Sequence, residues 1–287
     1  MRSGYHRSRH RHWQSGVVLE CVVNVSEGCD LERLMDLDQV CGKDRLDRHS
    51  DCHHHRSVFT LVGETAVRDL TARCLETLSL DVHHGVHPRL GVVDVVPFVP
   101  LAGSSIHDAC RARDDFAQWV GAELDVPVFV YGPADTDQRQ LPDIRRDAWT
   151  RLAPDFGPQH PHPTAGAICV GARHVLVAYN VWLEHSSIEV AHTIARDVRG
   201  DGVRALGLSV GNAVQVSMNL VDPRHVGPLE AFTRVEAVAQ SHGAHVTRGE
   251  LVGLVPQEVL QRVPRVRWEQ LDLSEDRTIE ARMDARR

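Results

Sequence analysis

The chain has 287 residues, of which 42% are hydrophobic and 25% are charged, and both values are ordinary for a globular protein. This composition excludes an intrinsically disordered, collagen-like or coiled-coil structure for the bulk of the chain. With 32 basic and 39 acidic residues, the formal net charge is −7, whereas nucleic-acid-binding proteins are usually basic. We therefore expect no nucleic-acid partner.

Residues 1–16 form a basic arm without an apolar core, which predicts a disordered segment and not a secretory signal. No stretch approaches the ~20 uninterrupted apolar residues of a transmembrane helix, so we expect a cytoplasmic protein without a membrane partner. The seven cysteines include no C-x-x-C pair. This argues against a disulfide framework or a zinc ribbon, and most of the cysteines are expected to be buried thiols.

Hydrophobic periodicity predicts alternating strands and helices after the arm. Up to residue 131, strands are expected at 17–25, 57–62, 91–99 and 126–131, and helices at 31–40, 65–78 and 105–124. The segment 91–99 is nearly all apolar, which is typical of a strand covered on both faces. Its single charged residue, Asp94, therefore needs a buried partner or a chemical role.

The segment 155–166 is rich in proline and glycine, which excludes a helix or a regular strand there. Beyond it, strands are expected at 175–182, 203–210, 214–220 and 250–256, and helices at 187–199 and 228–243. The pattern predicts an α/β (α+β) fold with two subdomains, at 17–174 and 175–271. Residues 272–287 are expected to form a charged, mobile tail.

Two histidine-rich segments, 47–56 and 81–91, precede predicted strands, and we expect both to be loops. The ends of buried strands are rigid and accessible, which favours catalysis there. Zinc bound by histidine, aspartate and cysteine is one alternative. We expect no metal, because these histidines lack the helical spacing of a motif such as H-E-x-x-H.

The motif G-V-H-P-R-L-G at 85–91 is more specific than the histidine count. Pro88 restricts the backbone after His87, and the flanking glycines allow a ligand to approach closely. An imidazole beside Arg89, which can bind a carboxylate, suits proton transfer on an acidic substrate. We predict that His87 is catalytic and Arg89 binds substrate, whereas His83 and His84 face water.

Several blocks of sequence resemble the formiminotransferase family, whose members transfer a formimino group from N-formiminoglutamate to tetrahydrofolate. The resemblance covers about residues 19–260. It rests on ECVVNVSEG (20–28), HRSVFTLVG (55–63), GVHPRLGVVDVVPFVP (85–100), PVFVYG (127–132), PDFGP (154–158), VGARHVLVAYNVWL (170–183), QVSMNL (215–220) and ELVGLVP (250–256). It implies a homodimer whose subdomains each carry a mixed sheet with outer helices, the two sheets facing one another across a folate-binding tunnel.

The resemblance also implies roles for particular residues. The family's catalytic histidine falls on His87, which would carry a proton between N5 of tetrahydrofolate and the leaving amine. Arg56 and Asp51 are further candidates for substrate contacts, with a structural ion pair as an equal alternative for Arg56; Asp51 or Asp94 is expected to orient the His87 ring. The family's folate-contacting loop falls on Gly157, Pro158, Gln159, His160, Pro161, His162, Pro163, Thr164, Ala165 and Gly166.

The sequence departs from the family pattern near this motif. Val86 replaces a glutamate, His55 replaces an asparagine, and His53 occupies a position that is often acidic. Loss of the glutamate charge predicts a pKa of His87 below its usual value of about 6.5. Two alternatives stay open: a folate-dependent formyl or formimino transferase acting on another amine, and a non-catalytic folate-binding homologue. At this length we expect no cyclodeaminase domain.

Overall fold

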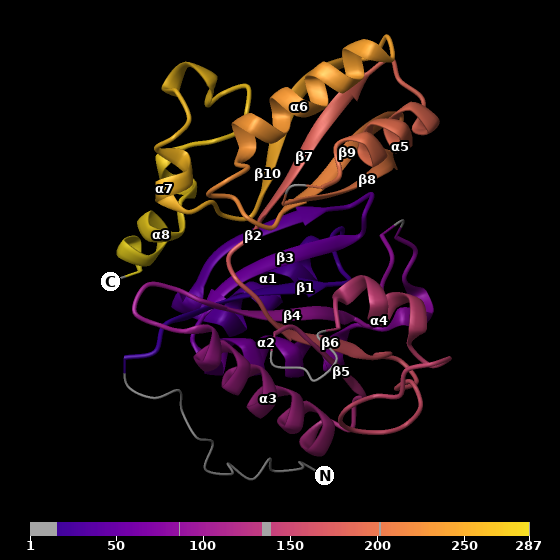
Figure 1. Cartoon of the computed structure of the whole chain (residues 1–287). Helices are drawn as coiled ribbons and strands as arrows, with labels where there is room; N and C mark the ends of the chain where they lie inside the picture. The colour runs from indigo at the N-terminus through magenta and orange to yellow at the C-terminus, as the bar shows by residue number, and fades with distance from the viewer. Residues whose placement is uncertain (1–15, 86, 134–138, 201, 287) are drawn as a thin grey trace.

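The computed structural model describes residues 16–85, 87–133, 139–200 and 202–286. The predicted arm at 1–16 therefore lies almost entirely outside the described residues, as does Val86. Two β-sheets, each with helices against it, form two subdomains that lie one above the other in Figure 1. We call them the N-terminal and the C-terminal subdomain.

The N-terminal subdomain contains a six-stranded sheet in the order β2-β3-β1-β4-β6-β5. β1 pairs antiparallel with β3 and β4, whereas β4, β6 and β5 run parallel, so the sheet is mixed as expected. The strands are β1 Leu19–Val25, β2 Arg45–Asp51, β3 Arg56–Val62, β4 Val93–Pro100, β5 Val128–Tyr131 and β6 Ile168–Ala172.

Three helices cover one face of this sheet: α1 (Leu31–Cys41), α2 (Glu64–Thr77) and α3 (Ile106–Glu123). Their apolar sides pack with inward side chains of β1, β3 and β4 in the largest buried cluster. On the opposite face, the short helix α4 (Leu141–Asp147) packs near β5 and β6. β2 and β3 lie next to the C-terminal subdomain (Figure 1).

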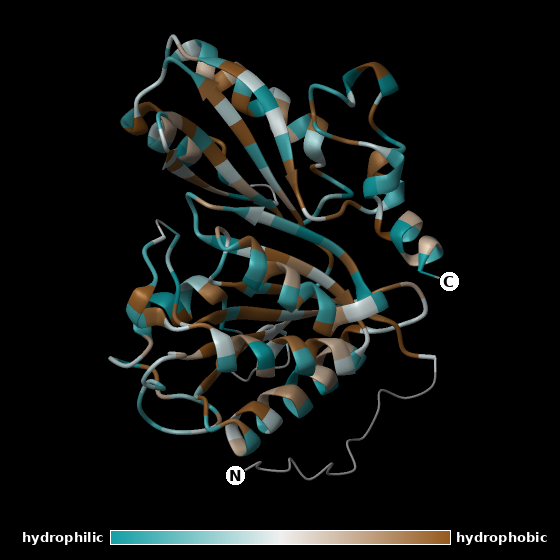
Figure 2. Ribbon diagram, turned by 180° about the vertical axis from the view of Figure 1, so that it is seen from behind, coloured by the Kyte–Doolittle hydropathy of each residue, from teal (hydrophilic) through white to brown (hydrophobic). Residues whose placement is uncertain are grey.

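The C-terminal sheet has the order β10-β7-β9-β8, with β7 Val177–Glu184, β8 Val203–Val210, β9 Ala213–Leu220 and β10 His245–Val252. All its pairs are antiparallel, so the expectation of a mixed sheet is wrong for this subdomain. Helices α5 (Ile188–Asp197) and α6 (Pro228–Ser241) pack on the outer face. Hydrophobic and polar residues alternate along these strands (Figure 2), because one face is core and the other looks toward β2 and β3.

The segment from residue 272 does not form the mobile tail that we expected. The chain forms α7 (Gln257–Leu260) and the short 3₁₀ turn η3 (Arg265–Arg267) before this segment. The segment itself contains a second 3₁₀ turn, η4 (Glu275–Arg277), and the helix α8 (Ile279–Ala285). Ile279 is buried with Leu46 and Val62 of the N-terminal subdomain and with Leu254 of the C-terminal one. The segment therefore joins the two subdomains through apolar packing. Most of its residues are polar or charged, so this packing could not be recognised from the sequence.

The predicted strands and helices are found with shifts of a few residues at most of their ends, and the last strand, β10, begins five residues earlier than expected. Five of the described strands and helices were not predicted: β2, β6, α4, α7 and α8. β2 includes residues 47–51, so the first histidine-rich segment is partly a strand and not wholly a loop. β2 lies at the edge of the sheet, and six of its seven residues are polar. It therefore lacks the alternating apolar residues by which a strand is recognised.

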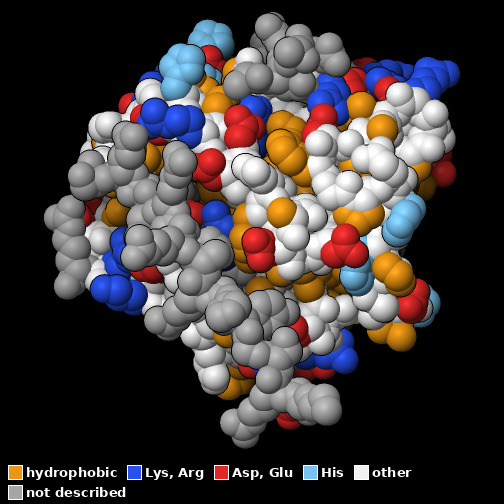
Figure 3. Space-filling view, turned by 90° about the horizontal axis from the view of Figure 1, so that it is seen from below, with side chains coloured by type: hydrophobic (Ala, Val, Ile, Leu, Met, Phe, Trp, Pro, Cys, Tyr) orange, Lys and Arg blue, Asp and Glu red, His pale blue; other side chains and the backbone are white. Residues whose placement is uncertain are grey.

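The surface carries charges of both signs. The lower face of the molecule (Figure 3) shows basic and acidic side chains interspersed. In the part of the chain that the structure describes, no helix is both long enough and apolar enough to span a membrane.

Candidate active site

His87 lies in the segment 83–91, the His87 loop, which connects η2 (Leu80–Val82) to β4. Its Nδ1 atom is 2.8 Å from the carbonyl oxygen of Pro88. Because a carbonyl only accepts, Nδ1 carries the proton in this contact, and the neutral ring has its lone pair on Nε2. The turn at Pro88 therefore directs a basic nitrogen away from its own backbone, as general acid–base chemistry requires.

The His87 loop packs directly against the turn between β2 and β3, residues 52–55. A side chain at Gly85 would place its Cβ 2.4 Å from the carbonyl oxygen of His54. Only glycine permits this approach. The ring of His87 consequently lies 6.3 Å from the ring of His54, centroid to centroid, with the planes nearly perpendicular.

A buried group of three charges, the Asp94 cluster, lies near His87. Asp94 is fully buried in β4 and accepts hydrogen bonds from Arg56 at 2.7 Å, from Arg145 at 2.6 Å and from the backbone of Leu90 at 2.8 Å. Burial opposes ionisation, but the two guanidinium groups lower the pKa of Asp94 to about 2. The prediction that Asp94 needs a partner is confirmed.

The Asp94 cluster changes the electrostatics of His87. Burial of the ring, followed by repulsion from Arg56, lowers the pKa of His87 to about 3. The expected direction is confirmed. The physical cause differs from the one we expected, because burial and an added cation act here. In the free protein His87 is therefore neutral at physiological pH and can accept a proton.

Asp51 contacts His54 and not His87. Its Oδ1 atom accepts the backbone N–H of His54 at 2.7 Å and lies 3.4 Å from the Nδ1 atom of the same ring. The other ring nitrogen of His54 is 3.4 Å from the side-chain nitrogen of Gln215, on β9 of the C-terminal subdomain. The expectation that Asp51 orients His87 is thus replaced by an Asp51–His54–Gln215 chain beside it.

His83 does not face water, contrary to our prediction. It is buried, its ring stacks on His55 with the centroids 4.2 Å apart, and its Nε2 atom is 2.9 Å from the carbonyl oxygen of His55. His55 in turn contacts the buried Glu27 at 3.1 Å. The neighbouring His84 is exposed, as predicted.

A disulfide joins Cys29, which follows β1, to Cys52 in the β2–β3 turn. Residues 26–30 and this turn already lie close together, because a Cβ on Gly28 would meet the carbonyl oxygen of Asp51 at 2.3 Å. The other five cysteines are free and buried, as expected. The C-x-x-C criterion missed this single bond because its partners are 23 residues apart in the sequence.

The predicted substrate-binding arginines make contacts within the protein. Arg89 donates to the backbone carbonyls of Gly85 and His87, the latter at 2.8 Å, and so braces the His87 loop. Besides its bond to Asp94, Arg56 donates to Asn24 at 2.9 and 3.2 Å. These contacts fix the position of both cations beside the histidine.

The predicted folate loop, 157–166, is irregular, as expected. Its first part, including Gly157, Gln159 and His160, is largely exposed, whereas Ala165 and Gly166 are buried. The backbone of Thr164 accepts from Leu80 at 2.8 Å, and the backbone of Ala165 accepts from Val92 at 3.0 Å. The loop is therefore anchored to both ends of the His87 loop.

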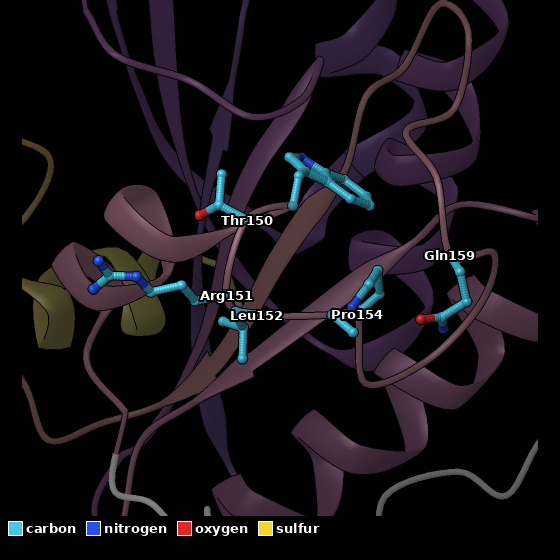
Figure 4. Close-up of a pocket in the computed structure, with 7 residues that line it drawn as sticks. Thr150, Arg151, Leu152, Pro154 and Gln159 are labelled. Atoms are coloured by element: carbon cyan, nitrogen blue, oxygen red, sulfur yellow. The ribbon is translucent and has the colours of Figure 1, made fainter.

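A small open pocket of about 280 Å³ lies beside this folate loop, lined by residues 149–154 and Gln159. Figure 4 shows Gln159 on the opposite side of the pocket from Arg151. None of the lining residues belongs to the His87 loop or to the Asp94 cluster. We therefore place the candidate active site at His87 and not in this pocket.

The C-terminal subdomain contributes polar groups that sequence reasoning did not single out. Glu250 on β10 accepts from Trp182 at 2.8 Å and Asn180 at 3.1 Å, and lies 3.5 Å from His49 on β2. Burial opposes ionisation, but these three hydrogen bonds lower the pKa of Glu250 to about 2. Gln215 and Glu250 are the first residues of QVSMNL (215–220) and ELVGLVP (250–256), two of the blocks that resemble the family. That position was the sequence signal that could have identified them.

Among the described residues, no group of three histidine, cysteine or acidic side chains is arranged to hold a metal ion. The arrangement that is present consists of a neutral histidine, a second histidine paired with a carboxylate, and two partly buried guanidinium groups bound to Asp94. Such a set can move a proton and hold negative charge close to it.

Comparison with known proteins identifies the family to which this arrangement belongs. The model of the N-terminal subdomain of the formiminotransferase domain matches residues 18–173, and the model of the formiminotransferase domain matches residues 178–283. The chain is 33% identical to glutamate formimidoyltransferase of Streptococcus pyogenes, over 85% of this chain and 90% of the relative. It is 34% identical to that of Thermoplasma acidophilum, over 93% and 97% of the two chains.

A third relative is formimidoyltransferase-cyclodeaminase of Sus scrofa, which is 35% identical over 85% of this chain but is covered over only 51% of its own length. The chain belongs to the formiminotransferase domain family. Its similarity to the fused proteins is confined to about half of their length.

Proposed function

We propose that the protein is a glutamate formimidoyltransferase, which moves a formimino group from N-formiminoglutamate to N5 of tetrahydrofolate. The observation that carries the proposal is His87, held in the family's motif with a free Nε2 near two partly buried arginines that both bind Asp94. Whole-length similarity to two proteins named glutamate formimidoyltransferase supports the same activity. The homodimer implied by the resemblance and the cytoplasmic location expected from the sequence are part of this proposal.

The proposed step balances without an external reagent. The lone pair of N5 attacks the formimino carbon, the π pair of the C=N bond moves onto its nitrogen, and a tetrahedral intermediate forms. N5 then loses its proton and the glutamate nitrogen gains one. The pair on the formimino nitrogen re-forms the C=N bond as the bond from the carbon to the glutamate nitrogen breaks, and its pair leaves with the amine. The products are 5-formiminotetrahydrofolate and glutamate.

His87 suits the transfer between the two nitrogens. Its neutral ring accepts the N5 proton on Nε2 and returns it to the leaving amine. A positioned base of this kind typically contributes ~10²–10⁴-fold to the rate. Burial of the ring and repulsion from Arg56 lower the pKa of His87, so the protonated histidine readily gives its proton to the leaving amine in the second half of the step.

Folate is proposed to bind beside the His87 loop, with residues 157–166 as one wall. Support comes from the hydrogen bonds that attach this loop to Leu80 and Val92, at the two ends of the His87 loop. Its prolines restrict the backbone in the free protein, which lowers the entropy lost on binding.

A coupled assay tests the proposal. The purified chain is incubated with tetrahydrofolate and N-formiminoglutamate, and formation of 5-formiminotetrahydrofolate is followed with and without a chelator. We expect turnover that needs both substrates and is unchanged by the chelator. Folate binding without turnover would instead favour a non-catalytic homologue, and turnover only with another amine donor would favour the other alternative.

A further inference from the structure

One buried polar atom near His54 lacks a hydrogen-bond partner among the described residues. Gln215 is 0% exposed, and its side-chain oxygen, Oε1, makes no hydrogen bond with any described residue. Leaving a buried acceptor without a hydrogen bond is energetically costly, so such an atom calls for an explanation. Its position on β9, against the β2–β3 turn of the other subdomain, places it where the two subdomains meet.

The contacts of His54 determine which end of the Gln215 amide is free. Asp51 can only accept, so the Nδ1 atom of His54 carries a proton. Burial lowers the pKa of His54 and keeps the ring neutral at physiological pH, so Nε2 bears a lone pair. Gln215 must therefore present its NH₂ group to His54, and its oxygen points elsewhere.

A free acceptor distinguishes the two groups that this class of reaction could transfer. A formimino group bears N–H at the position where a formyl group bears a carbonyl oxygen. The N–H can donate a hydrogen bond to the Gln215 oxygen. The formyl oxygen can only accept, so the two oxygens would repel each other and the Gln215 oxygen would stay without a hydrogen bond. Gln215 contacts His54, whose ring is 6.3 Å from that of His87, so His54 links the amide to the proposed catalytic histidine.

We propose that Gln215, oriented by the Asp51–His54 pair, is the residue that selects a formimino donor over a formyl donor. This inference rests on the proposed function, and it answers which one-carbon group the site accepts. A site built to hydrogen-bond a substrate N–H discriminates strongly against an analogue that lacks it, because the buried group is then left unpaired.

The experiment compares kcat/KM for N-formiminoglutamate and for N-formylglutamate, each with tetrahydrofolate. The wild-type protein is expected to prefer the formimino donor by at least about tenfold. Gln215→Met has the length of glutamine but neither donor nor acceptor, and it should lower that ratio by about tenfold or more. Gln215→Glu keeps an inward-facing oxygen, while its second oxygen shares a proton with Nε2 of His54 in place of the lost NH₂ group, and it should retain the preference. Asn219→Ala, further along β9, is the control and should leave the ratio unchanged.

The outcomes separate the two proposals. Wild-type transfer of the formimino group with the same donor ratio in Gln215→Met would overturn the role of Gln215 and leave the proposed function standing. Loss of the preference in Gln215→Glu would also overturn it, even if Gln215→Met failed to fold. A wild-type protein that transfers neither group would overturn both proposals. Circular dichroism and thermal unfolding verify that each variant is folded.

Discussion

At the scale of single residues, the charge states of Asp94 and His87 depend on how far each side chain is buried and on which charged groups surround it. Asp94 is fully buried, yet it stays ionised because two guanidinium groups surround it. Burial of the His87 ring, followed by repulsion from Arg56, lowers its pKa to about 3. The Asp94 cluster therefore keeps the Asp94 carboxylate ionised and favours the neutral form of the neighbouring His87 ring.

Replacing His87 by asparagine should lower kcat by roughly 10²-fold or more, because the titrating group is lost while a polar side chain remains. The affinity for reduced folate should change little. Steady-state kinetics and calorimetry provide the two readouts, with His84→Asn at an exposed position of the same loop as the control. Near-normal turnover in His87→Asn would remove this residue from the mechanism.

Glu20 predicts a pH dependence of stability. Burial raises the pKa of this side chain on β1 to about 7, so the folded state keeps a proton that the unfolded state loses above pH ~4.5. Its contribution to the free energy of unfolding therefore falls as pH rises from 4.5 to 7.

Glu20→Gln removes this dependence. Relative to wild type, the variant should gain on the order of 1–3 kcal/mol between pH 5 and pH 8. Urea unfolding at the two pH values measures the difference, with Glu32→Gln on the exposed side of α1 as the control. An equal effect of Glu20→Gln at both pH values would contradict the assignment.

At the scale of elements, the β2–β3 hairpin is the part of the fold that brings the site together. Its turn carries His54 and His55, and it contacts the His87 loop through Gly85 and residues 26–30 through Gly28. The disulfide from Cys52 to Cys29 closes the second contact covalently.

Loss of this disulfide should lower the free energy of unfolding by about 3 kcal/mol, the value that the chain-entropy estimate gives for a loop of this size. The variant is Cys29→Ala with Cys52→Ala, and denaturant unfolding measures the change. A reductant should destabilise the wild-type protein and leave the double variant unaffected. The same response in both proteins would show that the bond does not contribute.

At the scale of the whole molecule, the described residues join the subdomains through several polar and apolar contacts, three of which lie near the candidate site or at α8. His54 meets Gln215, His49 meets Glu250, and α8 packs Ile279 between Leu46, Val62 and Leu254. The first two are polar and lie on the face that looks toward the candidate site. The third is apolar and lies at the C-terminal end of the chain, so it can hold the subdomains together while the polar contacts exchange with a ligand.

Ile279→Ala should lower the free energy of unfolding by about 2–4 kcal/mol, because it leaves a cavity in a cluster shared by both subdomains. Met283→Ala, at a partly buried position of the same helix, should cost less. Denaturant unfolding followed by two probes, one in each subdomain, provides the measurement. Unchanged stability in Ile279→Ala would show that α8 is not docked in solution.

Most of the fold could be predicted from local patterns. Apolar runs and helical spacing mark β1, β4, β9 and α3 without reference to other elements, because each buries one continuous face. β2 and α8 escaped prediction because their polar sequences become partly buried only through contacts with distant residues. Charged residues after residue 272 suggested a mobile segment, whereas the few apolar ones determine where it packs.

For the candidate site, the sequence by itself determined His87, its proline and its glycines, because a tight turn beside a histidine is a local property. It also determined that Asp94 must have a partner, since a charge in an apolar strand requires one. Only the tertiary structure decided that the partners are Arg56 and Arg145, that Asp51 contacts His54, and that Gln215 reaches the site from the other subdomain. Such contacts join residues as far as 161 positions apart, and side-chain charge and burial at that range depend on how the sheets pack.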